Sequence, residues 1–230
     1  MKAMSLAAGR GERLRPLTDT TPKPLLMAGG RALIAWHLQG LARAGWREVV
    51  INHAHLGEQI EAALGNGSDF GLHIAYSPEA GGALETAGGI ASALPLLGDE
   101  PFLVVNGDIW CDWDFSRARR IASTLDREHA HLLLVDNPPH HPGGDFCLDG
   151  QIVRAATGNR TGSLTYAGIG VFPPDFFATV AAGVKMKLRP LLDAAIARGT
   201  LTGERHGGRW VDVGTRERLA ELDMELASSR

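Results

Sequence analysis

The 230-residue sequence predicts an α/β fold in one domain, and two features of the chain indicate it. Short apolar segments of strand length alternate with segments whose apolar residues recur at helical spacing, which is typical of α/β proteins. The first apolar segment, residues 1–8, leads directly into a glycine-rich loop that begins at Gly9. Glycines after a strand leave backbone N–H groups open to an anion, so this loop is a candidate phosphate site.

The first half of the chain has a regular alternation of strands and helices. A buried strand is expected within residues 1–8, and a helix at 32–43, because apolar side chains at positions 33, 34, 38 and 41 share one helical face. The elements expected next are a strand at 48–51, a helix at 55–64, a strand at 72–76, a loop at 77–82, a helix at 84–94 and a central strand at 102–105.

The second half has a less regular pattern. Asp149-Gly150 favours a hairpin turn between two short apolar runs. Thr215 is well placed to act as the N-cap of a final helix. The expected elements are a strand at 131–135, the hairpin at 146–153, a strand at 164–172, helices at 174–181 and 188–198, and an extended segment at 209–214.

Composition and charge exclude several classes of protein. The net charge is −3 and the chain has no basic run, which argues against a nucleic-acid partner. No apolar run approaches the roughly eighteen residues of a membrane helix, and residues 9–15 interrupt the N-terminal apolar stretch too early for a signal peptide. Two cysteines, Cys111 and Cys147, do not make a disulfide framework, so we expect reduced thiols and a cytoplasmic protein.

Three well-known phosphate loops do not fit the stretch after Gly9. A P-loop needs Gly-Lys-Ser/Thr, whereas Gly11 is followed by Glu12. A dinucleotide fingerprint needs a third glycine where this chain has Leu14. A kinase loop would need downstream His-Arg-Asp and Asp-Phe-Gly motifs, and the sequence contains neither. Two arginines and Lys23 follow instead, which favours a triphosphate site over a plain surface turn, the remaining alternative.

The motif Leu6-Ala-Ala-Gly-x-Gly-x-Arg13-Leu-x-Pro-Leu-Thr18, followed by Pro22-Lys-Pro-Leu25, resembles that of the sugar-1-phosphate nucleotidyltransferase family. Members of this family make nucleotide sugars from a nucleoside triphosphate and a sugar 1-phosphate. The resemblance implies a Rossmann-like three-layer αβα sandwich with a mixed central sheet, the nucleotide-diphospho-sugar transferase type. It also implies a single nucleotidyltransferase domain over residues 1–230. Bifunctional relatives carry a C-terminal β-helix of six-residue repeats, which is not expected in this chain.

The resemblance assigns roles on the nucleotide side of the site. Arg13 and Lys23 are the catalytic candidates, Arg13 for the departing β- and γ-phosphates and Lys23 for the α-phosphate. Residues 79–89 match the loop that reads the base and ribose, although a plain helix start with Glu85 in its first turn is the alternative. The expected nucleotide-binding residues are Leu6, Ala7, Ala8, Gly9, Gly11, Arg13, Lys23, Glu79, Gly82, Gly88 and Asn106.

Asp108 and Asp212 match family motifs whose aspartates hold a catalytic Mg²⁺. Asp108 follows the strand expected at 102–105, at the carboxyl end where open α/β sheets bind ligands. Magnesium prefers oxygen ligands and is usually held by one or two carboxylates, phosphates and water. The alternatives are a turn residue for Asp108 and a surface residue on an edge strand for Asp212.

The sugar side of the site is assigned by weaker matches. Gly144, Asp145, Gly168 and Lys187 correspond to the family's sugar-contacting positions, and Lys187 could equally be a solvated lysine. The pairs His140-His141 and His53-x-His55 lack zinc-site spacing, so we expect them to be loop histidines.

Within the family, the loops are most similar to those of uridylyltransferases that act on N-acetylmuramic acid 1-phosphate in peptidoglycan recycling. The expected partners are therefore UTP and that sugar phosphate, with no membrane and a monomer or weak homo-oligomer. Glu85 before Thr86 favours this reading over mannose 1-phosphate guanylyltransferase, the first alternative. The second alternative is a regulatory or binding protein that has the nucleotide loop but no catalytic activity. The lactyl carboxylate of the muramic sugar calls for a cation, and Arg154 and Arg160 are candidates.

Overall fold

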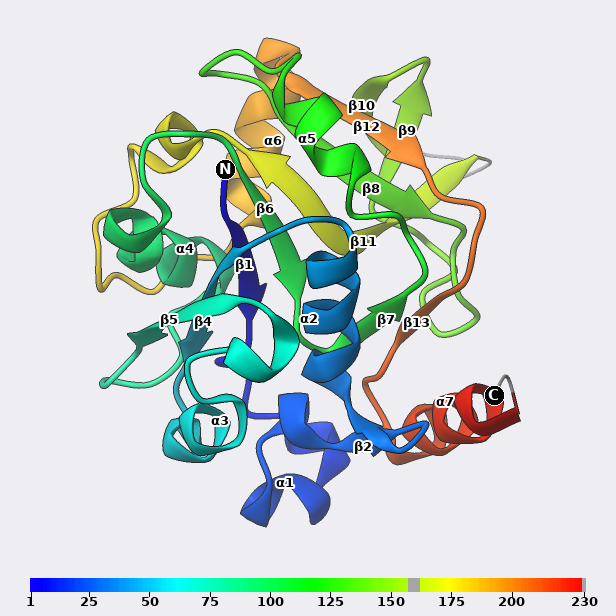
Figure 1. The fold of residues 1–230 in the computed structure, drawn as a ribbon. Helices are drawn as coiled ribbons and strands as arrows, with labels where there is room; N and C mark the ends of the chain where they lie inside the picture. Colours follow the sequence, from blue (N-terminus) through cyan, green and yellow to red (C-terminus); the bar gives the residue numbers. More distant parts are fainter. Residues whose placement is uncertain (157–161, 229–230) are drawn as a thin grey trace.

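The computed structural model describes residues 1–156 and 162–228. Within them, one nine-stranded sheet runs through the centre of the molecule (Figure 1). In spatial order its strands are β5 (His73–Pro78), β4 (Glu48–His53), β1 (Ala3–Leu6), β6 (Phe102–Asn106), β11 (Ser163–Phe172), β8 (Ala130–Val135), β12 (Leu201–Arg205), β10 (Ile152–Ala155) and β9 (Phe146–Asp149).

The sheet is mixed, as predicted, and its strand order reverses at β1. Strand β1 pairs in parallel with β4 on one side and with β6 on the other. Strand β5 continues the parallel part beyond β4, whereas β11 runs antiparallel to both β6 and β8. Because the chain leaves β1 in one direction and returns on its other side, a crevice forms beyond the carboxyl ends of β1 and β6.

Helices cover both faces of the sheet. Figure 1 shows α2 (Leu33–Arg43) in front of it and α6 (Arg189–Arg198) behind. The side chains of successive β1 residues point to opposite faces of the sheet. Ala3 packs in the core under α2, and Met4 packs in the core under α6. The first core also receives α3 (Gly57–Leu64) and α5 (Arg117–Ala122), and the second receives α4 (Glu85–Leu97). The predicted three-layer αβα sandwich is confirmed.

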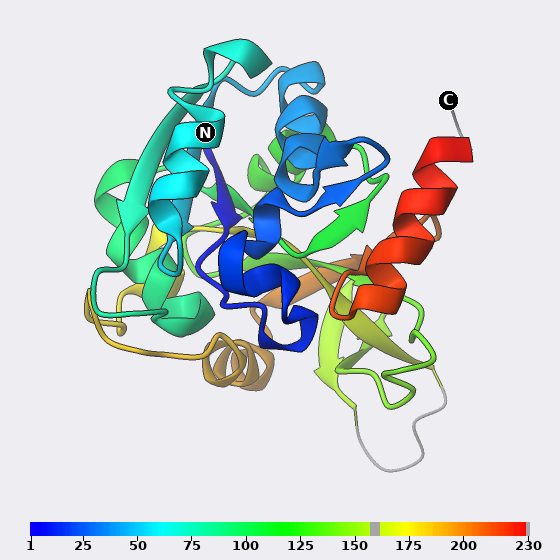
Figure 2. The same ribbon diagram turned by 90° about the horizontal axis from the view of Figure 1, so that it is seen from below.

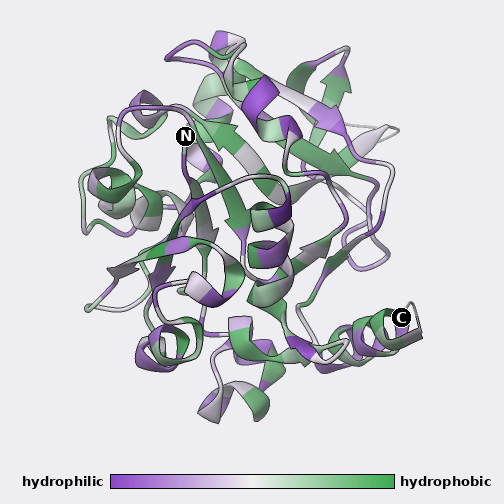
Figure 3. Cartoon of the chain, in the orientation of Figure 1, coloured by the Kyte–Doolittle hydropathy of each residue, from purple (hydrophilic) through white to green (hydrophobic). Residues whose placement is uncertain are grey.

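The central strands are apolar along nearly their whole length. Figure 3 shows β6 and β8 mainly in the hydrophobic colour, as expected of strands that are covered on both faces. No helix within the described residues has both the length and the apolar character that a membrane span requires.

A third apolar cluster joins the two ends of the chain. Helix α7 (Arg216–Ser228) lies beside the hairpin of β2 (Met27–Ala28) and β3 (Arg31–Ala32) (Figures 1 and 2). Its buried leucines pack with Leu14 and Leu26, which flank the short helical turns that follow the glycine-rich loop. These turns are η1 (Glu12–Leu14), α1 (Leu17–Thr20) and η2 (Lys23–Leu25). Thr215 Oγ1 accepts the N–H of Arg218 at 3.3 Å, so the predicted N-cap is confirmed.

Several element boundaries differ from the sequence-based expectations. Helix α3 begins at Gly57 rather than 55, because Leu56 before it adopts a left-handed φ of 54°. Helix α4 continues past Pro95 to Leu97, and the segment expected as a helix at 174–181 forms only the 3₁₀ turn η4 (Pro174–Phe177). The predicted hairpin forms, with the two-residue loop at Gly150-Gln151 since Asp149 pairs with Ile152.

Buried His37 makes the fold sensitive to acid. Burial lowers the pKa of this α2 side chain to about 4, and the charge of Asp108 opposes that effect to a smaller extent. The unfolded chain therefore binds a proton below its ordinary pKa near 6.5, whereas the folded chain does not until about pH 4. Stability should fall by about 2 kcal/mol between neutral pH and about pH 5 because of this residue. Urea unfolding at both pH values measures this loss of unfolding free energy, which should be smaller in His37→Leu than in wild type. An equal loss in the two proteins would contradict the role of His37.

Leu222 of α7 should hold the final helix on the rest of the fold. Its side chain is 1% exposed, whereas Met224 on the same helix is 65% exposed. Leu222→Ala should lower the free energy of unfolding by about 2–5 kcal/mol, because it leaves a cavity among apolar neighbours. Met224→Ala is the matched control and should change it by less than about 0.5 kcal/mol. Denaturant unfolding measures the free energy of unfolding of both variants. Similar losses in the two would contradict the packing of Leu222 against the rest of the fold.

Candidate active site

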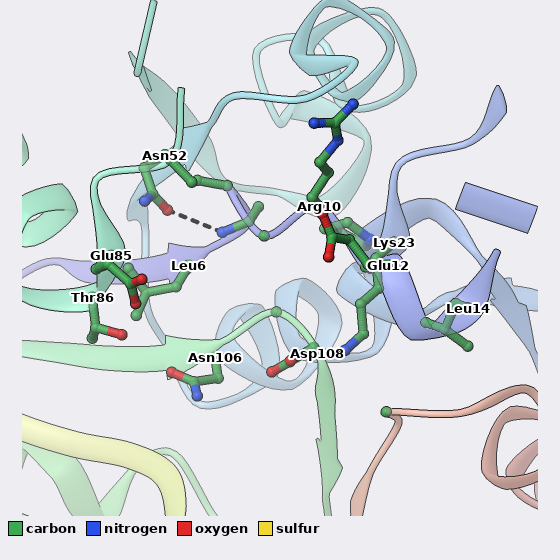
Figure 4. A pocket seen from close by; sticks show the side chains of 18 of the residues that line it. Leu6, Arg10, Glu12, Leu14, Lys23, Asn52, Glu85, Thr86, Asn106 and Asp108 are labelled. Carbon is green, nitrogen blue, oxygen red and sulfur yellow. Dashed lines mark hydrogen bonds and ion pairs between the residues drawn. The ribbon is translucent and has the colours of Figure 1, made fainter. Parts of the chain in front are cut away.

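A cavity of about 480 Å³ lies at the carboxyl ends of β1 and β6, in the crevice set by the strand order (Figure 4). Most of the predicted nucleotide-binding residues line it: Leu6, Ala7, Ala8, Gly9, Gly11, Arg13, Lys23 and Asn106. Residues outside the predicted set also contribute: Arg10, Glu12, Leu14, Pro24, Asn52, Ala83, Glu85, Thr86, Gly107, Asp108 and Gly214. The glycine-rich loop and the start of α4 therefore face each other across one space.

Gly11 lets the loop fold back on the segment that carries Lys23. Its φ of 66° is left-handed, and an added Cβ would lie 2.9 Å from Thr18 Cγ2 and 3.2 Å from Lys23 Cβ. The Thr18 hydroxyl donates to the Gly11 carbonyl at 2.9 Å, which closes the turn. The loop therefore requires glycine at this position for backbone and steric reasons.

A buried polar network connects this loop to the loop before α4. Asn52 Oδ1 accepts the Ala7 N–H at 3.0 Å, and Asn52 Nδ2 donates to Glu79 Oε1 at 2.7 Å. Glu79 Oε2 in turn accepts the Leu84 N–H at 2.7 Å. A Cβ at Gly89 would lie 2.6 Å from Glu79 Oε1, so this glycine makes room for the network. Glu79 thus lies behind the cavity and fixes its two walls.

Lys23 is held inside the protein by an ion pair. Its side chain is 7% exposed, and Nζ donates to Asp108 Oδ2 at 2.8 Å. Figure 4 shows the two groups meeting at the floor of the cavity. A buried ammonium group is stable only with such a partner, so the pair fixes a positive charge beside the loop.

The two predicted metal ligands come together through a short pair of strands. β7 (Ile109–Cys111) pairs with β13 (Trp210–Asp212), with Asp212 opposite Ile109. The Val213 N–H donates to the Asp108 carbonyl at 2.9 Å, so the two aspartates end up on adjacent strands. Asp212 Oδ2 accepts from Arg218 Nη1 at 2.7 Å and lies 3.2 Å from His140 Nε2.

A second cavity of about 350 Å³ adjoins the first. Arg13, Asn106 and Asp108 line both. The other residues of the second cavity are Ile109, Pro138, His140, His141, Thr165, Tyr166, Ala167, Gly168, Trp210 and Asp212. Two ligands, one in each cavity, would therefore meet beside Asp108, which is the arrangement that a transfer between two substrates requires.

Two residues that line the second cavity, Asn106 and Tyr166, each carry a buried polar side-chain atom. Among the described residues, neither Asn106 Oδ1 nor the Tyr166 hydroxyl has a hydrogen-bond partner. Burial raises the pKa of Tyr166, so its hydroxyl stays protonated at neutral pH and can donate. Gly168, with a φ of 75°, allows Asn106 to lie against it, because a Cβ there would be 2.7 Å from Asn106 Nδ2.

Two glycines predicted to bind the nucleotide lie outside the cavity walls. Gly88 packs in α4 against the segment around Met186, where a Cβ would collide with the Val184 carbonyl. Its N–H and that of Ala87 donate to the Met186 carbonyl. Gly82 has a φ of 100° in the loop before α4 and has open space around it. Gly88 therefore contributes packing, and Gly82 a turn.

On the sugar side, the second cavity is lined by Gly168 but not by the other predicted residues. Asp145 Oδ2 accepts the Tyr166 N–H at 2.9 Å, and a Cβ at Gly144 would lie 2.6 Å from Asn137 Oδ1. These two residues support the wall from behind. Lys187 is exposed and lines neither cavity.

The two arginines proposed for the lactyl carboxylate do not lie at the second cavity in the described structure. Arg154 is exposed on β10 beside Asp149, at 3.4 Å. Arg160 lies outside the described residues.

No local pattern marked Arg218 or Gly214, and His140 was expected to be a loop histidine. In the structure each of the three contacts Arg13 or Asp212, which only the fold brings close. Glu85, the residue that favoured uridylyl over guanylyl transfer in the sequence, has a φ of 60° at the cavity wall, which is strained for a non-glycine residue.

Cys111, Asp112 and His206 also come together, with ligand atoms within 4.8 Å of one another. Both cysteines are free, and burial raises the pKa of the Cys111 thiol to about 12, which disfavours the thiolate that binds metals. His206 Nε2 lies 2.7 Å from Asp112 Oδ1, and this hydrogen bond accounts for the contact. We interpret the group as structural.

The fold and the paired cavities define a nucleotide-dependent transferase. Residues 2–144 match the family model described as nucleotidyl transferase, and the chain belongs to this family. It is 57% identical over 96% of both chains to an N-acetylmuramate α-1-phosphate uridylyltransferase of Neisseria meningitidis serogroup B. It is 33% identical to an enzyme of the same name from Caulobacter vibrioides, over 99% of this chain and 97% of that one.

A solved structure supports the fold alone. The structure of a putative glucose-1-phosphate thymidylyltransferase from Bacillus anthracis, in complex with a sucrose, superposes with a TM-score of 0.85. It covers 99% of this chain and 95% of its own, at 22% sequence identity.

Enzymes of this family generally use a divalent metal ion. The donor set fits one, because Asp108, just before β7, and Asp212, at the end of β13, both offer carboxylate oxygens to the second cavity.

Gly214 should be required for the position of Arg13. A Cβ at Gly214 would lie 2.9 Å from Arg13 Nη2 and would also collide with Arg218 Nη2. Because guanidinium groups can shift, Gly214→Ala should cost less than about 1 kcal/mol of stability, yet weaken nucleoside triphosphate binding on the order of tenfold. Gly207→Ala, with open space around the new methyl group, is the control. Titration calorimetry measures the nucleoside triphosphate affinity of both variants, and thermal unfolding measures their stability. Wild-type affinity in Gly214→Ala would show that Gly214 is not needed to position Arg13.

Proposed function

We propose that this protein transfers a uridylyl group from UTP to N-acetylmuramic acid 1-phosphate, giving UDP-N-acetylmuramic acid and pyrophosphate. The reaction depends on Mg²⁺ and serves peptidoglycan recycling in the cytoplasm. Residues 1–230 act as one nucleotidyltransferase domain, in a monomer or weak homo-oligomer, on small molecules rather than on nucleic acid or a membrane. The observation that carries the proposal is the junction of two cavities at Arg13, Asn106 and Asp108. The 57% identity to the meningococcal uridylyltransferase supports the choice of substrates.

The chemistry needs positioning and charge neutralisation rather than a general base. An oxygen of the sugar phosphate attacks the α-phosphorus of UTP in line, and pyrophosphate leaves. The attacking oxygen belongs to a phosphate monoester that is already ionised near neutral pH. The protein therefore has to orient two anions and offset their charge.

Arg13 and Lys23 supply the fixed positive charges. The glycine-rich loop lines the first cavity, where its backbone N–H groups can bind the triphosphate. Arg13 lines both cavities and stabilises the departing pyrophosphate. Lys23, held by Asp108 at 2.8 Å, lies on the α-phosphate side.

Asp108 and Asp212 are the residues that would hold Mg²⁺, which when bound offsets phosphate charge and orients the reacting groups. In the structure, Lys23 and Arg218 neutralise these carboxylates. The aspartates therefore form part of a balanced charge network rather than an isolated acidic cluster.

Removal of either catalytic cation should slow turnover strongly. Arg13→Ala and Lys23→Ala should each lower kcat on the order of 100- to 1000-fold, as for the loss of a group that stabilises transition-state charge. Arg15→Ala is the control, because Arg15 belongs to the same segment but pairs with Asp19 and lines neither cavity. Pyrophosphate release measures all three; a catalytic variant within threefold of wild type would refute its assignment.

Substrate choice is tested by pyrophosphate release across UTP, GTP, dTTP and CTP, each with four sugar 1-phosphates. These are the 1-phosphates of N-acetylmuramic acid, N-acetylglucosamine, glucose and mannose. We expect release with UTP and the muramic sugar above all. Preference for GTP with mannose 1-phosphate would establish the guanylyltransferase alternative, and no release with any pair would establish a binding protein.

A further inference from the structure

The muramic sugar differs from N-acetylglucosamine by one lactyl ether, which ends in a carboxylate. An enzyme that prefers it needs a hydrogen-bond donor or a cation for that group. Among the described residues that line the second cavity, the side chains with positive character are Arg13, His140 and His141. Arg13 lies at the junction with the first cavity, where the phosphates meet. The two histidines therefore remain as candidates for the contact with the lactyl carboxylate.

His140 is polarised by an arginine behind it. Arg218 Nη1 lies 2.6 Å from His140 Nε2, and Arg218 is only 15% exposed. A guanidinium group has no acceptor, so Nε2 must accept this hydrogen bond. The proton of a neutral imidazole is then on Nδ1, on the other side of the ring from Arg218 and Asp212. Nδ1–H has no hydrogen-bond partner among residues 1–156 and 162–228.

His141 already has a hydrogen-bond partner within the protein. Its Nε2 lies 3.1 Å from Asp145 Oδ1, so the ring donates to a carboxylate of the protein itself. Asp145 also holds the Tyr166 N–H, and the contact thus stiffens the cavity wall. His140 is the histidine with a free donor and a positive charge behind it.

His140 is also placed to receive a substituent that projects from the sugar ring. Its side chain is 39% exposed, at the open side of the cavity. In the proposed reaction the sugar phosphate has to lie beside Asp108, which leaves the far side of the ring for the lactyl group.

We propose that His140, supported by Arg218, recognises the lactyl carboxylate and so selects an acidic sugar 1-phosphate over a neutral one. This inference rests on the proposed function. Nδ1–H donates to the carboxylate while Nε2 accepts from Arg218, which polarises the ring although the guanidinium itself is paired with Asp212. Neutral hexose phosphates lack the group and gain nothing from it.

The test compares kcat/KM for N-acetylmuramic acid 1-phosphate and N-acetylglucosamine 1-phosphate, with UTP. His140→Ala should lower the value for the muramic substrate about 10- to 100-fold, mainly through KM, as for a lost hydrogen bond to a charged group. The value for N-acetylglucosamine 1-phosphate should stay within about threefold, which also shows that the variant folds. His140→Gln keeps a donor and an acceptor and should recover part of the loss. His73→Ala, on the exposed start of β5, is the control.

A third substrate, the lactyl carboxamide of the same sugar phosphate, tests the role of charge. Wild type should use it about as poorly as His140→Ala uses the acid, and equal use of amide and acid would overturn the proposal. Equal losses on both natural substrates in His140→Ala would also overturn it, since His140 would then serve the shared phosphate or ring. A wild-type enzyme that does not turn over the muramic substrate would contradict the proposed function itself.

Discussion

The antiparallel pairing of β7 with β13 is the contact on which the rest of the site depends. It joins residues about a hundred positions apart, and it brings Asp212 of the second cavity near Asp108, which lines both cavities. Immediately after β13, Gly214 leaves space for the guanidinium of Arg13, and α7 begins. Arg218 in the first turn of α7 then reaches Asp212. If this two-stranded pairing were lost, both carboxylates and both arginines would lose their relative positions.

The walls of the nucleotide cavity are fixed by buried polar groups instead of by apolar packing. Asn52 and Glu79 are almost fully buried, and together they bond the backbone at Ala7 and at Leu84. A buried polar network is stable only when its members are satisfied, and then it specifies one arrangement. The spacing between the phosphate loop and the base loop is thus set before any ligand binds, which is how a site gains rate by positioning.

The sequence predicted the elements with strong periodicity and missed those whose stability comes from neighbours. Helix α2 and strands β4 and β6 have clear apolar patterns and form where expected. Strand β12 has a glycine and charged residues, and it exists because β8 and β10 pair with it on both sides. Among site residues, the loop glycines were predicted because their spacing is local. Gly88 and Glu79 stay predicted nucleotide-binding residues, but in the structure they do not line the first cavity, because a linear motif does not show which way a residue faces.

The two cavities divide the work of the enzyme between different parts of the chain. Nearly all residues of the first cavity lie within 2–144, the stretch that matches the family model, and Gly214 is the exception. The second cavity draws half of its wall from beyond that stretch, at 165–168 and 210–212. With the triphosphate in the first cavity and the sugar phosphate in the second, as we propose, the triphosphate site can stay constant while the wall that meets the sugar changes. His140 lies near the end of the matched stretch, where it reaches the second cavity and contacts Arg218 of α7. A change of sugar preference would accordingly need few substitutions, at the loops that carry His140 and Tyr166, without any disturbance of the phosphate loop.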